Sequence, residues 1–134
     1  MLTKPIPSTG EDLPIIGLGT YRTFNISLNH SNKQLEEVLN LFFEAGGTLI
    51  DTSPMYGKSE AIIGQLLGQI DSNIKTFLAT KVWTDGQQNG IDQMSQSLHK
   101  IGCSTMDLIQ IHNLIDADTH IKTLKEWREE GKIK

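Results

Sequence analysis

The feature that most constrains the fold of this chain is a regular alternation of short apolar segments with segments of helical period. The apolar segments are rich in Ile, Leu or Val, as expected for parallel strands that are covered on both faces. The candidate strands are Ile15–Leu18, Thr48–Asp51, Thr76–Lys81 and Asp107–His112. Equivalent positions Leu49, Leu78 and Ile109 are 29 and 31 residues apart, which is the length of one strand–helix unit. The spacing predicts consecutive parallel βα units with right-handed crossovers.

The segments that follow the strands have apolar positions at helical spacing. The predicted helices are about Asn32–Ala45, Ser59–Leu67, Gly90–Ile101 and Asp118–Glu130. Ser31 precedes the first helix as a candidate N-cap, and Gly131 follows the last as a candidate C′ residue. The apolar stripes include Val38 in the first helix and Ile121 in the last among the side chains that face inward.

Before the first strand, short extended pieces flank a turn, which predicts a hairpin-like arm over about residues 1–14. Residues 15–134 then form the βα units, and no linker divides the 134 residues, so a single domain is expected. The predicted fold class is α/β with four parallel βα units in the order 1-2-3-4. The alternative is a doubly wound, flavodoxin-like sheet, which requires helices on both faces and a switch point in strand order.

Composition excludes several classes of function. Lys and Arg number 12 and Asp and Glu number 16, a net charge of −4 without a block of like charge, so neither nucleic acid nor a membrane surface is expected as a partner. The single Cys103 cannot form an internal disulfide. His30, His99 and His120 lack metal-ligand spacing, and no apolar run resembles a signal peptide or a membrane span. We therefore expect a cytoplasmic protein without a metal site.

Four residues that can handle protons stand at the carboxyl ends of consecutive candidate strands. Asp51 closes the second strand, Tyr56 lies in the loop that follows it, Lys81 closes the third strand and His112 closes the fourth. In a parallel barrel these strand ends meet on the face where chemistry is carried out. An ammonium stabilises a phenolate and so lowers the pKa of a phenol, while a carboxylate keeps the ammonium charged. Each residue alone would be ordinary, but their joint placement predicts a proton-handling site.

The sequence around these residues is also informative. The relevant stretches are Asp51-Thr52-Ser53-Pro54-Met55-Tyr56-Gly57-Lys58-Ser59-Glu60, Ala79-Thr80-Lys81-Val82-Trp83 and Asp107-Leu108-Ile109-Gln110-Ile111-His112-Asn113. These stretches resemble the signatures of the aldo-keto reductases, which are NADPH-dependent carbonyl reductases built on a (β/α)8 barrel. The resemblance covers essentially the whole chain. The resemblance implies a TIM-barrel-like fold, of which the four βα units would form half, with the N-terminal hairpin closing the amino end.

The resemblance also implies a role for each residue. Tyr56 would be the general acid, Lys81 its activator, Asp51 the partner of Lys81, and His112 the donor that orients a small-molecule carbonyl substrate. The segment that ends in Gly19 would pass beside the nicotinamide. Cofactor contacts are implied for Gly19, Thr20, Tyr21, Asp51 and Asn113. Substrate-pocket walls are implied for Met55 and Trp83.

A full member of the family continues past Lys134 into a fifth strand and three more βα units, which carry most of the contacts to NADP(H). We therefore expect most of the cofactor-binding half to be absent from this chain. Two hypotheses of function follow. The first is NADPH-dependent reduction of an aldehyde or ketone, the activity that the resemblance implies. Whether this truncated chain itself is active or inactive is left open by the sequence. The second is a catalytically silent fragment or non-enzymatic binding subunit that retains the fold.

An open four-stranded sheet would expose both of its edges and the apolar side chains of its inner face. The strand residues concerned include Ile16, Leu49, Ile50, Leu78, Ile109 and Ile111, of which alternate positions would point toward the helices. The simplest solution is a homo-oligomer, a two-fold dimer in which the fourth strand of each copy pairs with the first strand of the other. An open sheet that is covered by its own helices, or aggregation, are the alternatives.

Overall fold

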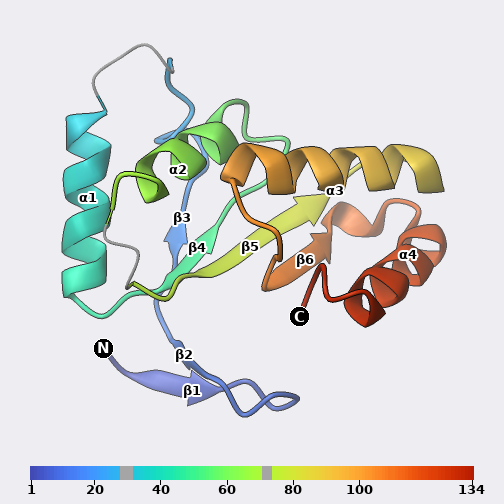
Figure 1. The fold of residues 1–134 in the computed structure, drawn as a ribbon, viewed down its shortest axis with the longest axis horizontal. Coiled ribbons are helices and arrows are strands. Elements are labelled where there is room, and N and C mark those ends of the chain that lie inside the picture. The colour runs from blue at the N-terminus through green and yellow to red at the C-terminus, as the bar shows by residue number, and fades with distance from the viewer. Residues whose placement is uncertain (28–31, 71–73) are drawn as a thin grey trace.

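The computed structural model describes residues 1–27, 32–70 and 74–134. The strands are β1 (Thr3–Pro5), β2 (Asp12–Pro14), β3 (Leu18–Gly19), β4 (Leu49–Asp51), β5 (Phe77–Val82) and β6 (Leu108–Ile111). The helices are α1 (Lys33–Glu44), α2 (Ser59–Leu67), α3 (Gln87–Ile101), the short 3-10 helix η1 (His112–Leu114) and α4 (Ala117–Glu129). Strands β3 to β6 form a parallel sheet in sequence order, and β1 and β2 form a separate antiparallel hairpin (Figure 1). The predicted strand order is confirmed, and the doubly wound alternative is wrong because the order has no reversal.

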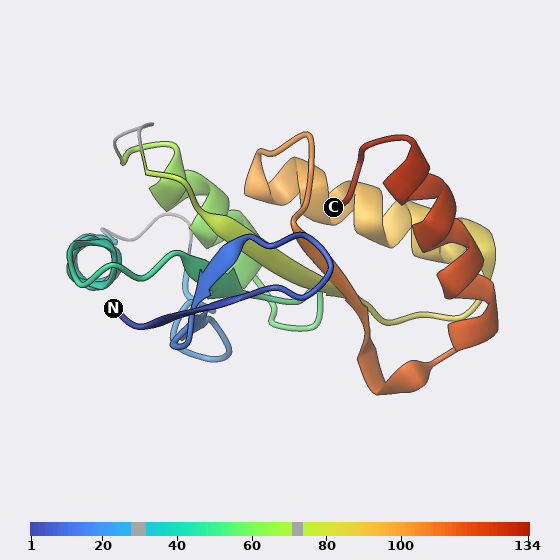
Figure 2. The same ribbon diagram turned by 90° about the horizontal axis from the view of Figure 1, so that it is seen from below.

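The helices lie on one side of the sheet. Helices α2 and α3 pack against it, while α1 lies toward the edge formed by β3 and α4 toward the edge formed by β6 (Figures 1 and 2). Ile50, Leu78 and Ile109 point toward this helical layer and are buried. The expectation that alternate strand residues point toward the helices is therefore confirmed for these three, because side chains alternate along a strand and theirs have the parity of the helical face. The opposite face, here called the inner face, carries Leu108, whose side chain is 42% exposed.

The register of the sheet fixes which residues share the inner face. Gly19 pairs with Asp51, Asp51 pairs with Ala79, and Ala79 pairs with Leu108. One step further along β5, Lys81 has the same parity as Ala79 and pairs with Gln110 on β6. The inner face therefore carries the side chains of Asp51, Lys81 and Gln110, and Gly19 occupies the corresponding position on β3.

Several boundaries differ from the predicted ones. The strand expected at Ile15–Leu18 is only Leu18–Gly19, because Ile15 continues the hairpin through an N–H bond to the carbonyl oxygen of Leu2 at 3.1 Å. Helix α3 begins three residues earlier than predicted, directly after Gly86, whose φ of 83° suits a glycine that ends a loop. The predicted N-cap Ser31 lies outside the described residues, and Asn32 occupies the N-cap position of α1.

Two side chains that were predicted to face the core are exposed. They are Val38 on α1 and Ile121 on α4. Both helices lie at the ends of the helical layer, so the flank of each apolar stripe has no neighbouring helix to cover it (Figure 1). In α4 the buried positions are instead His120, Thr123 and Trp127. The apolar period alone therefore predicted these helices but not the limits of their buried faces.

The free edge of β6 is partly occupied by the end of the chain. Met106, just before β6, forms a parallel bridge with Ile133. The Met106 N–H donates to Lys132 O at 2.9 Å, and the Lys134 N–H donates to Met106 O at 3.1 Å. The Lys134 ammonium also donates to Asp107, and this bond raises the pKa of Lys134. The β6 edge, which was expected to be unpaired, is therefore partly paired with the last residues of the chain.

The hairpin lies at the amino ends of the strands. Lys75 Nζ donates to Glu11 Oε1 at 2.6 Å, and this hydrogen bond lowers the pKa of Glu11. A cavity of about 330 Å³ lies between the hairpin and the inner face, with Leu13, Leu49 and Leu108 in its lining. It stands at the opposite end of the strands from Lys81. No helix in the described part of the chain is long and apolar enough to cross a membrane.

Candidate active site

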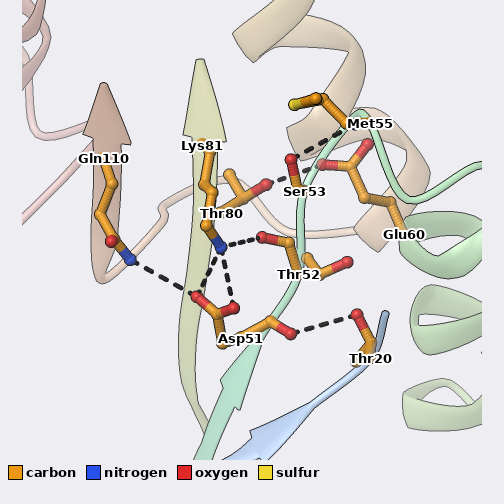
Figure 3. Close-up of polar contacts among 9 residues, drawn as sticks. All are labelled: Thr20, Asp51, Thr52, Ser53, Met55, Glu60, Thr80, Lys81 and Gln110. Atoms are coloured by element: carbon orange, nitrogen blue, oxygen red, sulfur yellow. Dashed lines mark hydrogen bonds and ion pairs between the residues drawn. The ribbon is translucent and has the colours of Figure 1, made fainter. Parts of the chain in front are cut away.

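The ammonium of Lys81 is the centre of the candidate site (Figure 3). Its Nζ donates to Asp51 Oδ1, to Asp51 Oδ2 and to the carbonyl oxygen of Thr52, each at 2.8 Å. The Lys81 side chain is 10% exposed and that of Asp51 is 35% exposed. Three acceptors match the three N–H donors of an ammonium, so the cation is neutralised, satisfied and held in one position.

Tyr56 lies over this ion pair. The Lys81 ammonium is 5.2 Å from the centroid of the Tyr56 ring, within the range of a cation–π contact. The loop that carries Tyr56 is fixed at its start and its end. The Tyr56 N–H donates to Ser53 O at 3.0 Å, and Ser59 Oγ donates to Tyr56 O at 2.8 Å. All three donors of Lys81 are used, so in this arrangement the ammonium has none left for a hydrogen bond to the phenol.

The loop between β3 and α1 is bonded to the same groups. The Thr20 hydroxyl donates to the Asp51 carbonyl oxygen at 3.1 Å, and the Ser59 hydroxyl, which has one proton for the Tyr56 and Thr20 carbonyl oxygens, lies 3.0 Å from Thr20 O. Thr20 is buried, so its hydroxyl holds the loop in place. Its neighbour Tyr21 is exposed, and its ring packs at 5.0 Å from the Tyr56 ring with an interplanar angle of 51°. A side chain at Gly19 would meet nothing within 4 Å, so open space lies above the backbone beside Asp51.

His112 stands at the end of β6 and starts η1. In the part of the chain that the structure describes, no hydrogen bond or ion pair joins its side chain to Asp51, Tyr56 or Lys81. Asn113, next to it, is exposed and has φ of 55°, a left-handed conformation that asparagine tolerates better than most residues. The structure therefore brings together three of the four predicted proton-handling residues, and places the fourth on the adjacent strand end without a direct bond to them.

The two predicted pocket residues flank the ion pair in sequence and are both exposed. The Trp83 side chain is 39% exposed. Its backbone is held by Gln93 of α3, whose Oε1 accepts the Trp83 N–H at 2.6 Å and whose Nε2 donates to Trp83 O at 3.1 Å. The amide of Gln93 thus takes the place of a neighbouring strand. Met55 donates its N–H to Ser53 Oγ at 3.3 Å.

Three polar residues near the site were missed by the sequence reasoning. Gln110 Nε2 donates to Asp51 Oδ1 at 3.4 Å, which gives the carboxylate a second donor (Figure 3). Glu60 is 1% exposed and accepts from Thr80 Oγ1 at 2.8 Å on the helical side of β5. The third is Gln93. Of these three, only Gln110 had a signal in the sequence, because it is a polar residue inside the apolar stretch 108–111.

Comparison with known proteins identifies the relationship. Residues 15–134 match the model of the aldo/keto reductase family. An aldo-keto reductase of Bacillus subtilis, YhdN, is 28% identical over 96% of this chain and 44% of its own length. The crystal structure of the thermostable aldo-keto reductase Tm1743 in complex with the inhibitor epalrestat has a TM-score of 0.84 at 25% identity, covering 99% of this chain and 52% of that one.

A second solved structure carries a cofactor. The aldo-keto reductase of Klebsiella pneumoniae in complex with NADPH has a TM-score of 0.78 at 25% identity, over 99% of this chain and 48% of that chain. The chain therefore spans about half the length of the relatives it matches.

Proposed function

The chain belongs to the aldo/keto reductase family, whose members are oxidoreductases, and from that premise we propose that it carries the proton-donating half of an NADPH-dependent carbonyl reductase. In this proposal the four βα units correspond to half of a (β/α)8 barrel, and residues 1–134 form one domain. The substrate is a small aldehyde or ketone. The observation that carries the proposal is the fully satisfied Lys81 ammonium, which is paired with Asp51 and lies 5.2 Å from the Tyr56 ring.

Reduction of a carbonyl group needs a hydride on carbon and a proton on oxygen. A phenol has an ordinary pKa of about 10 and is a weak acid at neutral pH, so it needs help to release a proton. The Lys81 ammonium lies 5.2 Å from the Tyr56 ring, and its positive charge is proposed to offset the negative charge that develops on the phenol oxygen as the proton is transferred. Asp51 keeps that charge in place, and its own position is fixed through Thr20 and Gln110. His112, on the next strand end, is proposed to donate to the substrate oxygen and orient it.

NADP(H) is the proposed cofactor, and when bound it supplies the hydride. The residues of this chain fit the nicotinamide end of such a group, because Gly19 leaves open space beside Asp51 on the inner face. Tyr21 and Asn113 are exposed on the loops on either side and are proposed to contact it. The solved relative from Klebsiella pneumoniae binds NADPH, which supports the choice of cofactor.

A titration with NADPH tests the proposal. Trp83 and Tyr21 are exposed near the site, so cofactor binding should quench their fluorescence. We expect a saturable change, and oxidation of NADPH when an aldehyde is added. A matched control is Trp127→Phe, because Trp127 is buried in the core and its removal should leave the cofactor-dependent quenching in place. Absence of any saturable change at millimolar NADPH would eliminate the enzymatic hypothesis for these 134 residues.

The competing proposal is a catalytically silent fragment or binding subunit. It is favoured by the coverage of the comparisons, since the chain corresponds to 44% of the length of the Bacillus subtilis relative. The two proposals differ in a simple observation. A silent chain would keep its fold and its thermal unfolding transition but would show neither NADPH binding nor aldehyde-dependent oxidation of the cofactor.

We also propose that the chain self-associates through its inner face and its free edges. Leu108 on the inner face and Ile16 beside β3 are exposed by 42% and 59%. Burial of each such side chain is worth roughly 1.5–3 kcal/mol, a large share of a typical domain stability of ~5–15 kcal/mol. A two-fold pairing of β3 with β6 would cover both, although the strand-like end of the chain at Ile133 would first have to leave part of the β6 edge.

A further inference from the structure

The β3–α1 loop places a cation beside the candidate site. The guanidinium carbon of Arg22 lies 5.2 Å from the centroid of the Tyr21 ring. The Tyr21 ring in turn lies 5.0 Å from the Tyr56 ring, and the Tyr56 ring lies 5.2 Å from the Lys81 ammonium. Two aromatic rings therefore separate two cations, of which one is nearly buried and the other stands at the exposed end of the series.

The backbone of Arg22 is held in an uncommon conformation. Its φ is 65°, in the left-handed region that a non-glycine residue rarely adopts. The loop is fixed on both sides of Arg22, because Thr20 and Phe24 are buried and the Phe24 N–H donates to Thr20 O at 3.3 Å. Asn25 donates its N–H to Arg22 O at 3.1 Å and accepts the Lys58 N–H at 3.0 Å. Strain of this kind persists where the surroundings impose it and is concentrated at functional sites.

The charge of Arg22 is not neutralised within the chain. Among residues 1–27, 32–70 and 74–134, no carboxylate forms an ion pair with its guanidinium, whereas Lys81 is fully paired by Asp51 and Thr52. A guanidinium presents five N–H donors in a planar fork that matches a carboxylate or a phosphate. Stacking on Tyr21 restricts the side chain before any ligand arrives, so less conformational freedom is lost when one binds.

We infer that Arg22 binds an anionic group of the ligand whose carbonyl end reaches Tyr56. This inference rests on the proposed function. The ligand class is a carbonyl compound with a carboxylate or phosphate at its other end, because the Tyr21 ring contacts both Arg22 and the Tyr56 ring. A carbonyl substrate that carries an acid group has this chemistry. The neutral alternative is an aldehyde without an acid group, which would gain nothing from the guanidinium.

Binding measurements on the whole chain test the inference without requiring turnover. The probes are 4-carboxybenzaldehyde, benzaldehyde and NADPH, each titrated by calorimetry into the wild type, Arg22→Met, Arg22→Lys and Lys4→Met. Lys4 is exposed on the hairpin at the opposite end of the strands, so Lys4→Met removes the same charge away from the site. We expect Arg22→Met to weaken binding of 4-carboxybenzaldehyde by about fivefold, the upper range for an exposed ion pair, and to leave benzaldehyde unchanged. Arg22→Lys should recover part of the loss.

The pattern of results identifies the source of the anion. A loss in Arg22→Met that is confined to 4-carboxybenzaldehyde supports an acidic substrate, whereas a loss confined to NADPH would place Arg22 at the phosphates of the cofactor and overturn the inference. Equal affinities of the wild type and Arg22→Met for all three probes, an equal loss in Lys4→Met, or no binding of any probe would overturn the inference. The proposed function fails separately: a chain that binds the acid probe through Arg22 but transfers no hydride from NADPH would retain the anion site and lose the reductase.

Discussion

The pairing of Lys81 with Asp51 makes a quantitative prediction about stability that does not depend on turnover. Asp51→Asn leaves the Lys81 ammonium, whose side chain is 10% exposed, without a counter-ion. Removal of one partner from a buried pair costs about 3–5 kcal/mol, and partial exposure of Asp51 reduces this to an expected loss of about 2–4 kcal/mol. Lys81→Met instead leaves a carboxylate that is 35% exposed and reaches water. Its main cost is the Thr52 carbonyl oxygen left without a donor, about 1–3 kcal/mol.

The double variant Lys81→Met/Asp51→Asn removes both charges at once. Its loss should resemble that of Lys81→Met alone, so the sum of the two single losses should exceed the double loss by about the Asp51→Asn loss, roughly 2–4 kcal/mol. The assay is urea unfolding of the four proteins, followed by far-UV circular dichroism and analysed by linear extrapolation. Protein concentration must be equal throughout, because self-association would shift the apparent stability.

Two outcomes would refute this reasoning. Losses that add within about 0.5 kcal/mol would mean that the two side chains do not interact appreciably in the folded chain. A larger loss for Lys81→Met than for Asp51→Asn would mean that the ammonium, rather than the carboxylate, tolerates isolation. Gln110→Leu serves as a matched control, because it removes the weaker 3.4 Å donor to Asp51 without changing any charge.

Further measurements address the acid, the chain end, the thiol and the assembly. If turnover is found, Tyr56→Phe should lower kcat by roughly 10²–10⁴ in a steady-state assay of NADPH oxidation, and an unchanged kcat would remove the assignment of the general acid. Hydrogen bonding to Asp107 raises the pKa of Lys134, so its contribution to stability is present at neutral pH and lost as the pH rises through the folded-state value; urea midpoints of the wild type and Lys134→Met should converge in alkaline solution. Burial raises the pKa of the Cys103 thiol, so iodoacetamide should alkylate it more slowly in the native chain than in urea, and equal rates would contradict this. Light scattering after gel filtration should give about twice the 14.9 kDa of one chain, and a monomer that resists concentration would contradict self-association.

The sequence predicted the placement of the site residues better than the extent of the strands. Asp51 and Lys81 were expected at two strand ends, and the strand register places both on the inner face, because alternation along a strand and the regular βα spacing determine such positions. Ile15 and Ile16 were expected in a strand for their composition alone. They are exposed beside β3, because an edge strand has only one partner and the hairpin captures the Ile15 N–H. Pairing partners of an edge strand are tertiary information, which composition does not contain.

Contacts between loops had no sequence signal. Ser59 bonds to Thr20 across 39 positions, and Asn25 accepts from Lys58 across 33. Each is a single side chain bonded to a backbone group, and neither depends on a period or a motif. Trp83 and Gln93 are only 10 positions apart, but their double hydrogen bond depends on how α3 packs beside the end of β5, which the helical period does not specify. Residue types at the strand ends therefore predicted where the candidate site lies, while the hydrogen bonds that hold its loops could be found only in the structure.

The hydrogen bonds of the candidate site are formed among residues of this chain. Lys81, Asp51 and Thr52 satisfy one another, and Ser59 links the Tyr56 loop to the loop of Thr20. Every partner in this set comes from β3, β4, β5 or the segments that follow them, so none is supplied by a further βα unit. The side chains proposed to donate the proton are thus positioned by hydrogen bonds within this chain. Binding of a carbonyl probe and binding of NADPH should for this reason respond separately to substitution, and a Tyr56→Phe variant that binds NADPH as the wild type does is the expected sign of that separation.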